Sequence, residues 1–134
     1  MTDSASGELP LGNEHDIVLS RQAVRRMTQQ QGFSLVDQTK MVTAASELAR
    51  NAVIYGGGGV LKWRLLSDGA KRGLRLVFED RGPGIPNMDL AMTDGWSSGT
   101  GLGLGLTGTR RLVNEFEIES TVGIGTRVTI TRWK

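Results

Sequence analysis

The sequence contains no cysteine among its 134 residues. Disulfide bonds, thiolate metal sites and cysteine nucleophiles are therefore excluded, and the composition suits a reducing cytoplasm, where we expect the protein to act. Long apolar runs are also missing, since no stretch approaches the ~20 residues that a membrane-spanning helix requires. The opening residues MTDSASGELP include neither a basic segment nor an apolar one, so we expect no signal peptide.

A strong excess of either charge is absent too. The chain has 16 basic and 14 acidic residues, a net charge of +2, so we expect neither a nucleic acid nor a membrane as its partner. The densest basic group consists of Arg21, Arg25 and Arg26, for which a solvated helix face is the simplest interpretation. The single histidine, His15, is interpreted as an incidental surface residue.

Periodic apolar residues predict the secondary structure. Apolar residues at helical spacing follow the capping residues Asn13 and Ser34, which predicts helices over residues 14–31 and 36–55. Alternating apolar residues between turns predict strands, with a short helical turn over residues 87–92 and a further helix over residues 107–115. The predicted strands span residues 8–11, 60–66, 74–80, 116–121 and 126–133.

This order of elements favours an α/β fold. Helices that precede and interrupt a block of strands joined mostly by hairpins predict a two-layer α/β sandwich, with helices on one face of a mixed β-sheet. The length fits one domain with a sizeable core. We therefore expect a single domain over residues 8–134, preceded by a disordered tail over residues 1–7.

Glycine is abundant, with 19 residues gathered mostly in two regions. In the segment EDRGPGIP, Asp80, Gly82 and Gly84 alternate directly after a predicted strand. A hairpin turn needs only one such backbone breaker, so the pattern favours a loop that brings backbone close to a ligand while it positions one carboxylate. A plain glycine- and proline-rich turn is the alternative.

Glu47 and Asn51 are spaced by four residues in the second predicted helix. This spacing places both side chains on one helix face, beside the apolar stripe. One interpretation is a solvated glutamate with an asparagine near the helix end. The other is a carboxylate base beside an amide oxygen that ligates a hard cation such as Mg²⁺. Spacing alone does not choose between them.

The segment GTGLGLGLTG precedes the third predicted helix. Successive unhindered backbone N–H groups at a helix N-terminus bind phosphate oxygens, which makes this segment a candidate phosphate site. It is neither a Rossmann loop nor a P-loop, because it lacks the GK[ST] ending and does not follow the first strand of a βαβ unit. A mobile surface loop is the alternative.

The order of these motifs resembles a known ATP-binding fold, shared by gyrase, Hsp90, histidine kinases and MutL. ELARN is similar to that family's N-box, and EDRGPGI, GTGLGLGL and VGIGTRV are similar to its three glycine boxes. The resemblance implies that Asp80 accepts the adenine amino hydrogen while Gly82 and Gly84 let the backbone close around the base. The ATP-binding residues that it implies are Asn51, Asp80, Gly82, Gly84, Gly99, Gly101, Leu102, Gly103, Leu104, Gly105 and Thr126.

The chain further resembles the RsbT-type switch kinases, small serine/threonine kinases of bacterial stress signalling. The similarity extends over SRQAVRRMTQQQGF, ELARNAVIYGGGG, FEDRGPGIP, DGWSSGTGLGLGLTGTRRLVNEFEIES and GTRV. It implies that the chain uses ATP and Mg²⁺, that Glu47 is the base for a substrate hydroxyl, and that Asn51 binds the Mg²⁺. Some related kinases place an arginine before the second glycine box, where this chain has Gly101.

The same resemblance implies protein partners. RsbT-type kinases phosphorylate STAS-domain antagonist or scaffold proteins and, when released, activate a PP2C-type phosphatase. With a single predicted domain, partner recognition is expected around the nucleotide mouth, at the first helix and at residues 94–105 with Trp96. We expect residues 94–105 to be a mobile lid that orders around the triphosphate.

Two other functions compete with this one. The first is an anti-sigma factor that sequesters a sigma factor and phosphorylates its anti-anti-sigma protein. The second is a bare ATPase, although ATPases of this fold usually carry a further transducer domain. The presence of Glu47 argues against pure sequestration, because a binding module has no use for a base.

Overall fold

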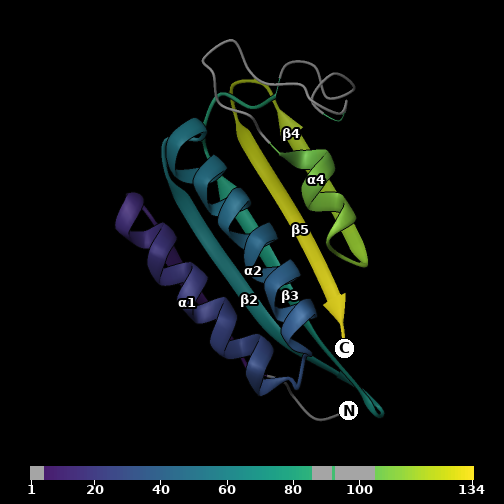
Figure 1. The fold of residues 1–134 in the computed structure, drawn as a ribbon. Helices are drawn as coiled ribbons and strands as arrows, with labels where there is room; N and C mark the ends of the chain where they lie inside the picture. Colours follow the sequence, from purple (N-terminus) through teal and green to yellow (C-terminus); the bar gives the residue numbers. More distant parts are fainter. Residues whose placement is uncertain (1–4, 86–91, 93–104) are drawn as a thin grey trace.

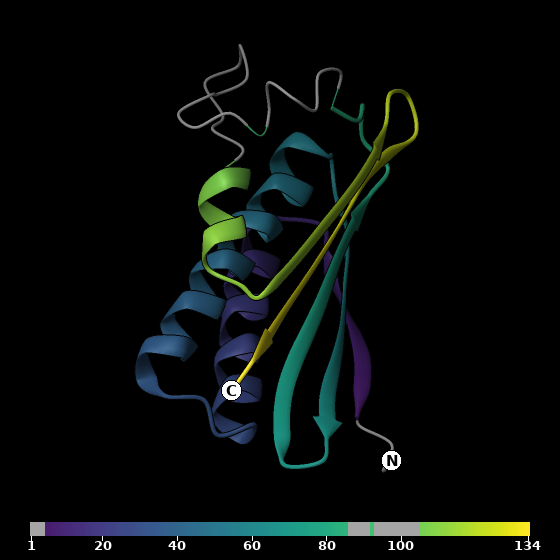
Figure 2. The same cartoon turned by 90° about the vertical axis from the view of Figure 1, so that its right-hand side faces the viewer.

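The computed structural model describes residues 5–85, 92 and 105–134. Helices α1 (Glu14–Gln30), α2 (Leu35–Arg50) and α4 (Leu106–Arg111) lie on one face of a five-stranded sheet, and no described element covers the other face (Figure 1 and Figure 2). The strands are β1 (Ser6–Leu11), β2 (Gly59–Asp68), β3 (Lys71–Asp80), β4 (Glu115–Thr121) and β5 (Gly125–Trp133). The predicted two-layer α/β sandwich is confirmed.

The sheet is antiparallel, so the prediction of a mixed sheet is wrong. Its strand order is β1-β2-β3-β5-β4, and every neighbouring pair in the described residues is antiparallel. The helices α1 and α2 form a hairpin between β1 and β2, which returns the chain against β1. The strands β3 and β4 do run in the same direction, but β5 lies between them. The order of elements along the chain does not reveal that β5 lies between β3 and β4, and so it led to the wrong prediction of a mixed sheet.

The two long helices begin at the predicted capping residues. The Asn13 side chain accepts a hydrogen bond from the Asp16 N–H at 3.0 Å, and Ser34 does the same for Asp37 at 3.1 Å. Each bond satisfies an N–H that has no partner inside its helix. Local sequence thus determines where both helices start.

The end of the second predicted helix differs from a regular α-helix. After Arg50 the chain widens into one π-helical turn, η1 (Asn51–Tyr55), in which the Gly56 N–H donates to the Asn51 carbonyl at 2.8 Å. Such turns are rare and are often found at functional sites. Here the wide turn begins at a residue that the sequence had singled out.

Two predicted boundaries near the N-terminus are also corrected. Ser6 and Gly7 pair with Arg64 and Trp63 of β2, so β1 starts before the predicted strand, and the predicted tail over residues 1–7 is too long. Residues 1–4 of that tail lie outside the described residues.

No helix in the described part of the chain is long and apolar enough to cross a membrane.

The helix α4 ends at Arg111, before the predicted end at residue 115. Asn114 already donates its N–H to the Thr131 carbonyl at 2.9 Å, and Glu115 pairs with Thr131 in the sheet. Asn114 and Glu115, which the local pattern assigned to a helix, are therefore hydrogen-bonded to the sheet instead. A helical turn predicted over residues 87–92 lies outside the described residues, apart from Met92.

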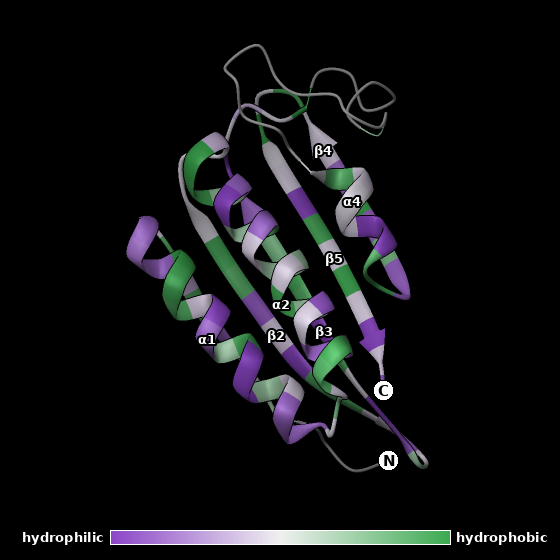
Figure 3. Ribbon diagram, viewed as in Figure 1, coloured by the Kyte–Doolittle hydropathy of each residue, from purple (hydrophilic) through white to green (hydrophobic). Residues whose placement is uncertain are grey.

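The core lies between the helices and the inner face of the sheet. Along β3, Leu74, Leu76 and Phe78 are almost fully buried, at 0%, 0% and 3% exposure, while the residues between them are partly exposed. Figure 3 shows the same alternation of hydrophobic and hydrophilic residues along β5. Burying one such leucine contributes about 1.5–3 kcal/mol to the stability of the fold.

Candidate functional site

A narrow pocket lies at one end of the inner face, where α2 and η1 end, β3 ends and β5 begins (Figure 1). The helix α4 packs against α2 beside it. The pocket is lined by Leu48, Asn51, Ala52, Tyr55, Phe78, Asp80, Ile85, Leu106, Thr126 and Val128. Three predicted ATP-binding residues, Asn51, Asp80 and Thr126, are therefore brought to one place from three different elements.

Asp80 is the one carboxylate among the described residues that line this pocket. The Gly82 N–H donates a hydrogen bond to its Oδ1 at 2.9 Å, which fixes the carboxylate at the end of β3. Burial raises the pKa of Asp80, while hydrogen bonds from the backbone of Gly82 and Thr126 act in the opposite direction. Its remaining lone pairs can accept a hydrogen bond from a ligand inside the pocket.

Glycines let the chain pack tightly around Asp80. A Cβ added at Gly56 would lie 2.6 Å from Oδ2 of Asp80, and one at Gly82 would lie 2.6 Å from the Gly56 Cα. Gly84 has a φ of +76°, and a Cβ there would also collide with the Thr121 carbonyl. Each of these three positions thus requires glycine for close approach, and Gly84 requires it for its backbone conformation as well.

The loop after β3 is held to the hairpin between β4 and β5. The Ile85 N–H donates to the Ser120 hydroxyl at 2.7 Å, and Ser120 lies 2.8 Å from the Thr126 hydroxyl. The Gly123 N–H donates to the Pro83 carbonyl at 2.9 Å. These bonds explain why a hairpin near the C-terminus lines a pocket built around residues 80–85.

Glu47 lies one helical turn before Asn51, at the edge of the pocket. Its carboxyl packs against Gly105, where an added Cβ would lie 2.6 Å from Oε1. Gly105 has a φ of +63° at the N-cap of α4, so glycine is needed there for conformation and for space. Partial burial raises the pKa of Glu47, and the charge of Arg50 opposes this.

The residues that form the pocket fit a nucleotide base. Seven of the lining side chains are apolar or aromatic, which suits the faces of a flat ring, and Asp80 and Thr126 supply polar groups. The cavity is only about 20 Å³ in this structure. Binding a base therefore requires the walls of the pocket to separate.

The donor set also fits a Mg²⁺ ion that keeps phosphate and water ligands. No group of three or more His, Asp or Glu side chains suited to a metal occurs within residues 5–85, 92 and 105–134. Asn51 is one of the residues that line the pocket, and its side chain carries an amide oxygen. Mg²⁺ commonly binds through one or two protein oxygens plus substrate phosphates, and this pocket can supply such an arrangement.

Several predicted site residues lie outside the described residues. These are Gly99, Gly101, Leu102, Gly103 and Leu104, together with Trp96.

Other residues of the site were not predicted from the sequence. Gly56 supports Asp80, Ser120 anchors the loop, and Tyr55 donates its hydroxyl to the Gly84 carbonyl at 3.3 Å. The four-glycine run after the second helix was a signal that could have identified Gly56.

Comparisons with known proteins agree with this geometry. Residues 36–134 match the family described as "Histidine kinase-, DNA gyrase B-, and HSP90-like ATPase". The chain is 44% identical over 120 residues to "Serine/threonine-protein kinase RsbT" of Bacillus subtilis (strain 168), covering 90% of each chain. It is 32% identical over 115 residues to an "Anti-sigma F factor" of Clostridium kluyveri, covering 81% of this chain and 80% of that one.

Solved structures support the fold. A structure of the RsbU and RsbW domains of a Mycobacterium tuberculosis protein matches 98% of this chain with a TM-score of 0.66 at 24% identity. The match covers 32% of the solved chain, which holds both of those domains. The nucleotide-free catalytic domain of the histidine kinase ThkA matches 98% of this chain with a TM-score of 0.53 at 15% identity.

Proposed function

Because the chain belongs to the RsbT-type serine/threonine-protein kinases, within the histidine kinase-, DNA gyrase B- and HSP90-like ATPase family, we propose that it phosphorylates a STAS-domain antagonist or scaffold protein of bacterial stress signalling. When released from that protein, it activates a PP2C-type phosphatase. The observation that supports this most is the pocket that unites Asn51, Asp80 and Thr126, with Glu47 one turn away.

In this proposal the pocket holds the adenine of ATP. Asp80 accepts a hydrogen from the adenine amino group, since Gly82 already occupies one of its oxygens and fixes its direction. Leu48, Phe78 and Val128 contact the ring faces. Gly105 and the predicted glycines before it supply backbone N–H groups to the phosphates.

Glu47 is the proposed general base. It takes the proton from the serine or threonine hydroxyl while the hydroxyl oxygen bonds to the γ-phosphorus and the bond to the β-phosphate oxygen breaks, which leaves ADP. The pKa of Glu47 is raised by burial, which makes the carboxylate a stronger base than an exposed glutamate. Its packing against Gly105 would hold it near the phosphate end of the site.

Asn51 is the proposed protein ligand of Mg²⁺. The ion would neutralise charge on the phosphate oxygens. Asn51 lies at the start of the wide π-helical turn, and its own N–H donates to the Glu47 carbonyl one turn earlier, so the two residues share one helix face. The ATP requirement also leads us to propose the cytoplasm as the place of action.

We propose that the partner surface includes the solvent-exposed side of α1. Arg21 and Arg26 are exposed there, while Arg25 is partly buried and contacts the Gln38 amide oxygen at 3.4 Å. Two exposed arginines would favour a partner surface with acidic residues, through association that depends on salt.

An anti-sigma factor remains the second candidate function. Its support is the similarity to anti-sigma F factors at 30–32% identity, which is lower than the identity to RsbT. In that case the chain would hold a sigma factor and phosphorylate the protein that releases it.

Labelled ATP can distinguish the two candidates. The protein is incubated with γ-labelled ATP and an extract of its native cell, and the labelled proteins are identified. We expect a STAS-domain protein labelled on serine or threonine, and labelling that is about 10²-fold slower or more with Glu47→Gln. Co-purification of a sigma factor, without a phosphatase of the PP2C type, would favour the anti-sigma candidate and contradict the proposal.

A further inference from the structure

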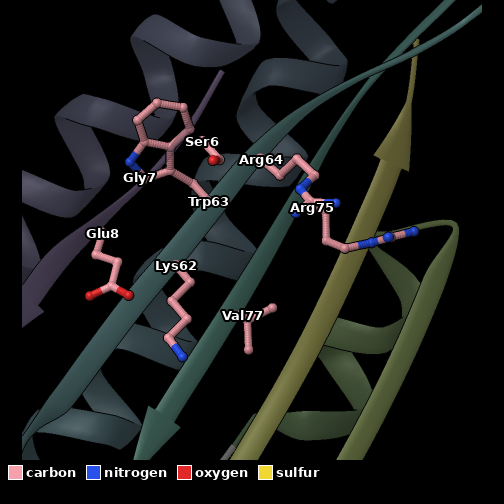
Figure 4. Close-up of a pocket in the computed structure, with 8 residues that line it drawn as sticks. All are labelled: Ser6, Gly7, Glu8, Lys62, Trp63, Arg64, Arg75 and Val77. Carbon is pink, nitrogen blue, oxygen red and sulfur yellow. The ribbon is translucent and has the colours of Figure 1, made fainter. Parts of the chain in front are cut away.

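The open face of the sheet carries a hollow that the proposed reaction does not use. A cavity of about 450 Å³ lies over β1, β2 and β3, on the face away from the helices (Figure 4). Its walls include Ser6, Glu8, Lys62, Arg64, Arg75 and Val77. Three of these six side chains are cationic and only one is a carboxylate.

Two of the cations face each other across neighbouring strands. Arg64 on β2 is directly opposite Arg75 on β3 in the register of the sheet, and Figure 4 shows the two side by side. Like charges directly opposite each other destabilise a sheet. A pair of arginines in this position is therefore unfavourable unless an anion comes between them.

The contacts within the chain leave this pair only partly neutralised. Lys62 forms an ion pair with Glu79 at 2.7 Å. Arg75 donates to the Thr131 hydroxyl at 3.0 Å and lies 3.9 Å from the Glu115 carboxylate. Arg64 has no hydrogen bond or ion pair with any residue that the structure describes. The guanidinium of Arg64 is thus available to an anionic ligand.

We propose that this hollow binds an acidic peptide segment of a protein partner, with its carboxylates on Arg64 and Arg75. Guanidinium groups bind carboxylates through two parallel hydrogen bonds, which gives direction as well as affinity. Val77 supplies apolar surface for the stems of the bound side chains, whereas the indole of Trp63 packs against the core on the opposite face of the sheet. This surface is independent of the proposed kinase reaction.

An extended segment fits the shape of the open face. A second hollow of about 580 Å³ shares Glu8 and Lys62 with the first, and a third of about 180 Å³ shares Arg75. The three hollows are therefore neighbours on the open face of the sheet, linked by the residues that they share. A stretch of peptide can extend over neighbouring hollows, whereas a single small anion would occupy only the arginine pair.

The charges around the arginine pair favour a peptide over a nucleic acid. Glu8 lines the hollow on the β1 side, and Glu115 and Glu117 line the third hollow on the β4 side. A nucleic acid that spanned the trough would place phosphates against these carboxylates. A peptide can place acidic residues on the arginines and neutral or basic residues beside Glu8 and Glu117.

The test uses a dye-labelled peptide in which aspartate and glutamate alternate with serine, and a second peptide with the corresponding amides. Fluorescence anisotropy measures their binding to the full chain. We expect saturable binding of the acidic peptide only. Arg64→Glu should weaken it about tenfold or more, while the matched change Arg110→Glu at an exposed position of α4 should weaken it about twofold at most.

A second readout separates binding from a structural role. Because Arg64→Glu places a carboxylate opposite Arg75, we expect its melting temperature to rise while its peptide affinity falls. Absence of saturable binding to the unaltered protein would overturn the proposal. So would equal losses in the Arg64→Glu and Arg110→Glu variants, or tighter binding of a short single-stranded DNA that Arg64→Glu abolishes.

Discussion

The two faces of the sheet give neighbouring residues of one strand opposite environments. On β3, Leu76 and Phe78 face the helices and are buried, whereas Arg75 and Glu79 face outward and form ion pairs. At the end of the strand, Asp80 continues the inner series and lines the narrow pocket. Because successive side chains of β3 point to opposite faces of the sheet, the proposed nucleotide site and the charged outer surface lie on opposite faces. Matched substitutions on adjacent residues can test that separation.

The largest expected effect concerns Glu47. Glu47→Gln keeps the size of the side chain but removes the base, so phosphoryl transfer should fall about 10²–10⁴-fold while Mg-ATP still binds. Single-turnover transfer to the phosphoacceptor protein measures the rate, and calorimetry measures binding. Glu117→Gln, on the outer side of β4, should leave both unchanged. Normal transfer by Glu47→Gln would return Glu47 to the role of a partly buried surface residue.

Next in size is the loss of core packing on β3. Leu76→Ala removes a side chain with 0% exposure, and the cavity should lower the free energy of unfolding by about 2–5 kcal/mol. Val77→Ala, one residue later on the open face, should cost about 1 kcal/mol or less. Urea unfolding of both variants measures the difference. Equal losses would mean that the two faces are not distinguished by burial.

Nucleotide affinity should depend on Asp80 but not on its neighbour. Asp80→Asn replaces an acceptor by a group that also donates, so pairing with adenine should weaken by about 1–3 kcal/mol. Glu79→Gln changes the adjacent residue, whose side chain pairs with Lys62 on the other face, and should bind ATP normally. Calorimetry with Mg²⁺ present gives both affinities. Unchanged affinity in a folded Asp80→Asn variant would remove Asp80 from the site.

The smallest expected effect is a dependence of stability on pH. Burial raises the pKa of Glu47 above its ordinary 4.5, so the folded state binds this proton more tightly than the unfolded state. Stability is therefore lost as pH rises through the window above 4.5. Glu47→Gln should melt at a higher temperature than the unaltered protein near neutral pH, with a smaller difference in acid. An equal difference at both pH values would contradict this.

Much of the fold could be predicted from local sequence. Asn13 and Ser34 cap helices where predicted, because a capping bond involves residues only three apart. The antiparallel sheet could not be predicted in the same way, since it depends on β5 lying between β3 and β4. The end of α4 was missed for a similar reason, because Glu115 is held by Thr131 of another strand.

The site divides in the same manner. Asp80, Gly82 and Asn51 were singled out because they fall in short motifs. Gly56 and Ser120 were missed, because their roles depend on contacts with Asp80 and Ile85 that are distant in sequence. Sequence patterns thus predicted the polar groups of the pocket, whereas the residues that hold those groups in place required the structure.

Glycine amide signals in an NMR titration test most directly whether the nucleotide binds in the narrow pocket on the inner face. These signals lie in a distinct spectral region, and glycines occur both around the pocket and away from it. Gly56, Gly82 and Gly105 surround the narrow pocket, whereas Gly7 and Gly73 lie on strands away from it. With a non-hydrolysable ATP analogue and Mg²⁺, the first three signals should shift and the last two should not. Shifts at Gly7 and Gly73, with Gly56, Gly82 and Gly105 unchanged, would contradict the placement of the nucleotide on the inner face.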